Sequence, residues 1–140
     1  GNKKALKILK RTISELDKSN IFVRYHNEIE YSEIEQKYFS ADLSIFASSC
    51  ETFGQIVVES MATGLPIACS NMSAMPELLG ECAVYFNPLD IDDIEITIRQ
   101  LIDSKDQREY IANKAYEHAS DYSWDETALK TFNFLKEVLE

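Results

Sequence analysis

The sequence predicts an α/β fold in which a parallel β-sheet is flanked by helices. Apolar residues make up 45 % of its 140 residues, enough to form the core of one domain over residues 1–140. Segments with the pattern of strands alternate along the chain with segments of helical periodicity. The strand segments are continuous apolar runs, which are typical of parallel strands that are buried on both faces.

The first part of the chain contains two predicted helices and two predicted strands. Over residues 3–18, leucine and isoleucine recur at spacings of three and four, which predicts an amphipathic helix. The apolar runs 21–25 and 43–47 predict strands, and Ser32 with Glu35 forms a capping box for a helix that ends near residue 39. No strand precedes the first helix, although a βαβ unit normally begins with one. We therefore expect the first strand to be truncated and the chain to begin partway through a larger α/β domain.

The second part of the chain continues the alternation. A helix is expected from Phe53 to Thr63, because Gly64 fits the position after a helix and Pro66 cannot continue it. Asp90 and Ser123 are expected N-caps of two later helices, and Trp124 is expected to anchor the last helix against the sheet. The remaining predicted elements are strands at 67–69 and 83–86, a short helix at 76–79 and a helix at 107–119.

Composition excludes several classes of partner. The net charge of −10 and the pI of about 4.7 argue against binding of nucleic acid, which requires basic surfaces. No apolar run approaches the roughly 18–20 residues that span a bilayer. Cys50, Cys69 and Cys82 are odd in number, lie in apolar surroundings and lack the spacing of metal ligands, so we expect reduced core thiols of a cytoplasmic protein.

Two glutamates frame the predicted helix 53–63. Glu51 precedes the helix, and Glu59 lies about five residues into it, or roughly 7–8 Å along its axis. Ligands of open α/β sheets bind where strands lead into helices, and the first amides of a helix favour an anion. Gly54 lacks a Cβ, so a phosphate could approach the backbone there. One ligand with hydroxyls, then phosphates, then ribose hydroxyls could therefore contact both carboxylates.

A second interpretation needs no ligand. Glu51 would be a solvated loop residue, and Glu59 would lie on the polar edge of an ordinary helix. Glu59 is, however, flanked by the apolar residues Ile56, Val57, Val58 and Met61. It is the only charged residue of a helix that we expect to be largely buried. A charge in such a place is costly unless it is paired or has a task.

Residues 41–80, ADLSIFASSCETFGQIVVESMATGLPIACSNMSAMPELLG, resemble the nucleotide-sugar-binding half of GT-B glycosyltransferases. The pattern is Glu51, seven residues and Glu59, with Phe-Gly after the first glutamate, then a turn ending in proline, then Pro-Glu. The most similar group is the retaining, group 1 or family 4 type. The resemblance extends more loosely through VYFNPLDIDDIEITIRQLI and YSWDETA. It implies a Rossmann-like domain, one half of a GT-B fold.

The resemblance also implies roles for the residues around the helix start. Glu51 would contact hydroxyls of the donor sugar and be the catalytic residue that this chain supplies. The backbone around Phe53, Gly54 and Gln55 would hold sugar oxygens and the distal phosphate, with Ile56 also in the substrate-binding segment.

Other roles are implied for the far end of the donor. Glu59 would accept hydrogen bonds from the ribose hydroxyls. The strand end at Arg24, Tyr25 and His26 would face the base, largely through main-chain groups. No metal ligand and no cofactor are expected.

The implied activity is transfer of a hexose, with retention, from a UDP- or GDP-linked donor to an acceptor hydroxyl. The product class would be a cell-surface polysaccharide or glycolipid, and the protein would be cytoplasmic or peripheral at the inner membrane face. The family's N-terminal acceptor domain and the basic pair that clamps the diphosphate are absent from this sequence, so the fragment alone should bind donor weakly and turn over negligibly. A nucleotide-sugar epimerase of the same fold and a non-catalytic nucleotide-sugar-binding module remain alternatives.

Three further motifs have simpler explanations. Asp90-Ile91-Asp92 matches the Asp-x-Asp motif of metal-dependent glycosyltransferases, but Asp90 is explained as a helix cap. His118 near a helix end is expected to be a surface residue that compensates the helix dipole. The segment 70–73 follows a strand and could line the ligand cleft or form an ordinary turn.

Overall fold

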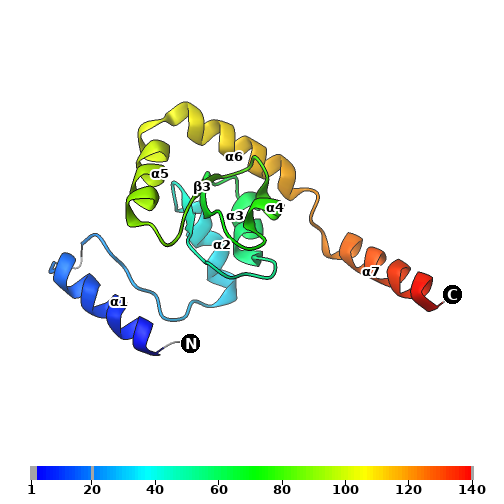
Figure 1. Ribbon diagram of the computed structural model, residues 1–140, viewed down its shortest axis with the longest axis horizontal. Coiled ribbons are helices and arrows are strands. Elements are labelled where there is room, and N and C mark those ends of the chain that lie inside the picture. The colour runs from blue at the N-terminus through cyan, green and yellow to red at the C-terminus, as the bar shows by residue number, and fades with distance from the viewer. Residues whose placement is uncertain (1–2, 20, 140) are drawn as a thin grey trace. The chain divides into compact units, whose positions relative to one another are not determined.

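The structure is a computed structural model that describes residues 3–19 and 21–139. Its contacts divide the chain into two compact units, Gly1–Ile34 and Glu35–Glu140. The described part of the first unit holds helix α1 (Lys3–Leu16), and helix α2 (Tyr31–Phe39) begins in the first unit and ends in the second. The sheet and the remaining helices belong to the second unit (Figure 1).

The sheet confirms the predicted fold class. Strands β1 (Ser44–Phe46), β2 (Ile67–Ser70) and β3 (Val84–Phe86) are parallel and lie in the order β1-β2-β3. The register pairs Ile45 with Ala68 and Cys69 with Tyr85. Because all three strands run the same way, the loops that follow them meet at one edge of the sheet.

In the part of the chain that the structure describes, five helices follow the first strand. They are α3 (Gln55–Ala62), α4 (Met75–Leu79), α5 (Ile91–Asp103), α6 (Lys105–Ala119) and α7 (Trp124–Leu139). Helix α6 packs against α3, and in Figure 1 it crosses the second unit in yellow and orange. Helix α5 packs against β2 and β3. No helix within residues 3–19 and 21–139 is long and apolar enough to cross a membrane.

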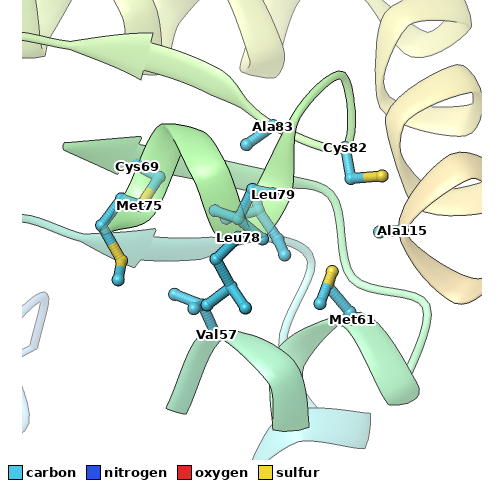
Figure 2. Packing of buried hydrophobic residues seen from close by; sticks show 10 residues of the cluster. Val57, Met61, Cys69, Met75, Leu78, Leu79, Cys82, Ala83 and Ala115 are labelled. Carbon is cyan, nitrogen blue, oxygen red and sulfur yellow. The ribbon is translucent and has the colours of Figure 1, made fainter. Parts of the chain in front are cut away.

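The core shows why the central strand is largely apolar. Every residue of β2 is buried, and successive side chains enter two different clusters. Cys69 packs with residues of α3, α4 and α6, and Figure 2 shows Val57 and Met61 of α3 directed toward α4. Ala68 packs instead with Phe86 and with Leu101 of α5. Helices therefore cover both faces of the sheet, as continuous apolar strands predict.

The predicted strand 21–25 is wrong. Asp17, which follows α1 and is almost fully buried, accepts hydrogen bonds from three amides of this segment: those of Ile21 (3.0 Å), Phe22 (2.7 Å) and Val23 (2.8 Å). These bonds lower the pKa of Asp17, with the bond from Val23 as the largest cause. A nearby carboxylate thus takes the donors that a sheet ladder would have used.

Helix ends differ from the sequence expectations in two places. Helix α2 begins at Tyr31, so Ser32 lies inside the helix and is not its N-cap. Helix α6 begins at Lys105, two residues before the expected start, because the Ser104 hydroxyl accepts a hydrogen bond from the amide of Gln107 (3.2 Å). The other expected caps are confirmed. Asp90 accepts hydrogen bonds from the amides of residues 92 and 93, and Ser123 accepts one from the amide of residue 126.

Two expectations of burial also fail. Trp124 is 79 % exposed and α7 buries none of its described residues, so the indole does not anchor this helix on the sheet. All three cysteines are free thiols, but only Cys69 and Cys82 are buried, whereas Cys50 is exposed in the loop after β1. Burial raises the pKa of the Cys69 thiol to about 12, which keeps it protonated and unreactive.

Candidate functional site

The candidate site begins where the loop after β1 leads into α3. Gly54 is the N-cap of α3 and adopts a left-handed conformation, with φ of 81°. A Cβ at this position would lie 2.6 Å from the terminal methyl of Met75 in α4. Glycine is therefore favoured by the left-handed backbone conformation, and a Cβ would also force the end of the Met75 side chain to move. Both features hold without any ligand, so they are independent of the phosphate approach that the sequence suggested.

A serine from the next loop fastens this segment. The Ser73 hydroxyl accepts a hydrogen bond from the Glu51 amide (3.0 Å) and donates one to the Glu51 carbonyl. Ser73 has a positive φ of 61°, an uncommon conformation for a residue with a side chain. The loops after β1 and β2 are thus joined at the sheet edge, and the backbone of Glu51 is fixed in place. The sequence left the role of segment 70–73 open.

The Glu51 carboxylate is only partly buried. Among the described residues, no side-chain hydrogen bond or ion pair involves it. The structure therefore fixes the main chain of Glu51 and leaves its side-chain oxygens accessible to a ligand hydroxyl.

Glu59 has a different environment. Its carboxylate is half-buried and accepts a hydrogen bond on each oxygen: from the Tyr38 hydroxyl (3.0 Å) and from the Gln55 amide group (3.1 Å). The Tyr38 hydroxyl also lies 3.3 Å from the Ile56 carbonyl. Sequence reasoning missed Tyr38, because an aromatic residue at helical spacing is expected in the core by default.

The predicted substrate-binding residues at the start of α3 lie together. Phe53 is 50 % exposed and Ile56 is 53 % exposed, while Gln55 is exposed apart from its bond to Glu59. The expectation that helix α3 is largely buried is therefore right only for the face that carries Val57, Ser60 and Met61.

His118 near the end of α6 and Tyr122 just after it contact this segment and α4. The ring of Tyr122 packs edge-on against Phe53, with ring centroids 6.2 Å apart. Its hydroxyl donates to the Leu78 carbonyl (3.2 Å), which also lies 3.0 Å from Nε2 of His118. Nδ1 of His118 lies 3.1 Å from a carboxylate oxygen of Asp121. His118 is thus a half-buried link between α6 and α4 as well as a residue near a helix end.

Arg24, Tyr25 and His26 lie in the first unit, on an exposed segment that is not a strand. The Lys10 ammonium group lies over the ring of Tyr25, 5.0 Å from its centroid, in a cation–π contact. The proposed contact of these three residues with a base remains a prediction. No group of three or more potential metal ligands occurs within residues 3–19 and 21–139.

Comparison with known proteins assigns the family. A profile described as "Glycosyl transferases group 1" matches residues 1–118. The chain belongs to this family. It is 28 % identical over 115 residues to O-antigen chain mannosyltransferase B of Escherichia coli, and the aligned residues cover 82 % of this chain and 30 % of that protein. The chain thus spans less than a third of this relative's length.

Solved structures share the fold. The C-terminal domain of a glycosyl transferase group 1 family protein from Francisella tularensis matches with a TM-score of 0.68 and 25 % identity, over 84 % of this chain and 62 % of that one. Anabaena HepE in complex with UDP matches with a TM-score of 0.79 and 22 % identity, over 96 % of this chain and 37 % of that one. The chain therefore has the Rossmann-like α/β fold of GT-B glycosyltransferases, as the motif predicted.

Proposed function

We propose that this chain is the donor-binding domain of a retaining glycosyltransferase that transfers a hexose from a UDP- or GDP-linked donor to an acceptor hydroxyl. One observation supports this proposal most directly. Two carboxylates, one with free oxygens at Glu51 and one held by two donors at Glu59, occur at the two ends of the segment that starts α3. Such an arrangement suits a ligand with hydroxyls at both ends.

Each part of the donor would meet a group suited to it. Glu51, fixed through Ser73, would accept hydrogen bonds from hydroxyls of the hexose. The diphosphate would lie against the amides and positive dipole at the start of α3, beside Gly54 and Gln55. Glu59 would accept hydrogen bonds from the ribose hydroxyls. The chain would therefore bind and orient the donor, and the rate of transfer would depend on closure with an acceptor-binding domain.

Finer features of the proposal come from relatives. A role in polysaccharide synthesis is suggested by the O-antigen mannosyltransferase, and UDP as the nucleotide by the complex of HepE. Retention, the N-terminal acceptor domain and a cytoplasmic or peripheral location follow from the family resemblance. The weak activity expected of the fragment alone belongs to the same proposal.

Calorimetric titration of the intact protein with UDP, GDP and their hexose derivatives tests the proposal. We expect binding of one nucleotide and tighter binding or a distinct enthalpy for its sugar derivative, because only the latter reaches Glu51. Incubation of the protein together with the acceptor-binding domain that the proposal assumes, the preferred donor and an acceptor should release free nucleotide and give a product whose anomeric configuration matches the donor. Failure to bind any nucleotide would contradict the proposal, and conversion of the donor sugar without transfer would favour the epimerase.

A further inference from the structure

The Glu59 carboxylate is held by donors from two different helices. Tyr38 reaches it from α2, and Gln55 reaches it from one turn earlier in α3. Each donor uses a different oxygen, Oε2 for Tyr38 and Oε1 for Gln55. A carboxylate offers about four lone-pair positions, so about one acceptor position remains on each oxygen. The two bonds together fix the plane of the carboxylate.

The Tyr38 hydroxyl is suited to be a permanent donor. Burial raises the pKa of Tyr38 to about 12, and the hydrogen bond and the negative charge of Glu59 add to this effect. The phenol therefore keeps its proton throughout the pH range in which proteins work. Its bond to an ionised carboxylate is of the charge-assisted kind, which is stronger than a bond between neutral groups.

We propose that Tyr38 is a positioning residue that orients the Glu59 carboxylate for two-point recognition of the 2′,3′-diol of a ribonucleotide. The inference rests on the proposed function, in which Glu59 binds ribose. Two vicinal hydroxyls can each donate to one oxygen of a carboxylate only when the plane of that carboxylate faces them. Tyr38 and Gln55 supply that orientation before the ligand arrives, so its cost is not paid at binding. The ligand class that this arrangement selects is a nucleotide with an intact diol.

A purely structural role for Tyr38 predicts a different outcome. If Tyr38 only supported the packing of α2 on α3, its loss would weaken binding of every nucleotide alike. If it acts through Glu59, its loss should affect only ligands that carry the diol. Tyr85 offers a matched control, because its hydroxyl also donates to a carbonyl, that of Gly80 (2.8 Å), and its pKa is likewise raised to about 12 by burial.

The test measures dissociation constants of UDP and 2′,3′-dideoxy-UDP, or the GDP pair if GDP is preferred, for the intact protein and its variants. For Tyr38→Phe we expect about tenfold weaker binding of the ribonucleotide, equivalent to one net hydrogen bond, and unchanged binding of the dideoxynucleotide. Tyr85→Phe should leave both constants unchanged. Gln55→Ala, at an exposed position, should produce a similar diol-specific loss of several-fold without touching the core.

Three outcomes would overturn the inference. Equal losses for both nucleotides in Tyr38→Phe would show that the hydroxyl acts through the fold. Unchanged binding of the ribonucleotide in both Tyr38→Phe and Gln55→Ala would show that orientation of Glu59 is immaterial. A wild-type protein that binds nucleotide without preferring the diol would remove the ribose role of Glu59, whereas one that binds no nucleotide would overturn the proposed function itself.

Discussion

Substitution of Gly54 by alanine should destabilise the second unit through two separable effects. An L-residue in the left-handed conformation that Gly54 adopts costs roughly 1–2 kcal/mol. The new Cβ would also lie 2.6 Å from the terminal methyl of Met75 and 3.3 Å from its sulfur, so the Met75 side chain must move within a packed core. Because this methyl is the far end of a flexible side chain, the shift should cost only about 1 kcal/mol, at the low end of overpacking. We expect Gly54→Ala to lower the free energy of unfolding by about 2–3 kcal/mol.

Urea denaturation followed by circular dichroism measures this loss. Gly64→Ala is the matched control, because Gly64 also has a positive φ, of 68°, but a Cβ there would meet the Tyr116 ring only at an ordinary contact distance of 3.9 Å. It should show the conformational cost alone. In a Met75→Ala background the additional cost at position 54 should disappear. Equal losses for Gly54→Ala and Gly64→Ala, or an undiminished difference in that background, would refute the packing argument.

Three further expectations follow from the site and its surroundings. Glu59→Ala should weaken nucleotide binding in calorimetry by about tenfold or more, with little change in thermal stability. Glu51→Ala should weaken binding of the nucleotide sugar more than binding of the plain nucleotide. If both variants weakened the binding of both ligands equally, the separate roles of the two glutamates would be contradicted. Tyr122→Phe should cost about 0.5–1.5 kcal/mol in thermal denaturation, toward the lower end because the Leu78 carbonyl retains its contact with a histidine, and an unchanged melting temperature would show the bond to be weak. The pKa of Asp17 is lowered in the folded protein, so its stabilising bonds are present above its ordinary pKa of 3.8 and are lost as the pH falls through the lower folded value. Protection of the amides at 21–23 from hydrogen exchange, measured by NMR, should therefore decline in acid. In Asp17→Asn this protection should be weaker and should not depend on pH.

The sheet was predictable because most residues of each strand are apolar. Helices pack against both faces of the central strand, which carries Ala68 and Cys69, whereas Ile45 in the edge strand β1 is 48 % exposed. The run at 21–25 is also apolar apart from Arg24, but a buried aspartate four to six residues away accepts hydrogen bonds from its amides. A periodicity argument cannot detect this competition, since it weighs apolar side chains and not the partners of backbone groups.

The two glutamates of the candidate site were proposed from spacing, charge and the family resemblance, but the residues that hydrogen-bond to them were not predicted. Ser73 acts through a backbone hydrogen bond to a residue 22 positions earlier, and Tyr38 contacts a carboxylate 21 positions later. Neither contact leaves a periodic trace in one sequence. Gly54 was singled out for the approach of a phosphate, which stays a prediction. The structure gives two other reasons for a glycine there, its positive φ and the nearby Met75 side chain, and the sequence revealed neither.

The charge of the chain explains why these supporting residues matter for the proposed ligand. A protein with a net charge of −10 that presents two glutamates to a diphosphate gains little from overall electrostatics. Neither glutamate forms an ion pair among the described residues, and the dipole at the start of α3 is worth only about 0.3–1 kcal/mol at an exposed site. In the proposed function, much of the affinity that this chain supplies would therefore come from ligand hydroxyl groups that donate to the two carboxylates. Such bonds depend strongly on direction, so we expect the side chains of Tyr38 and Gln55 to influence binding by orienting the Glu59 carboxylate.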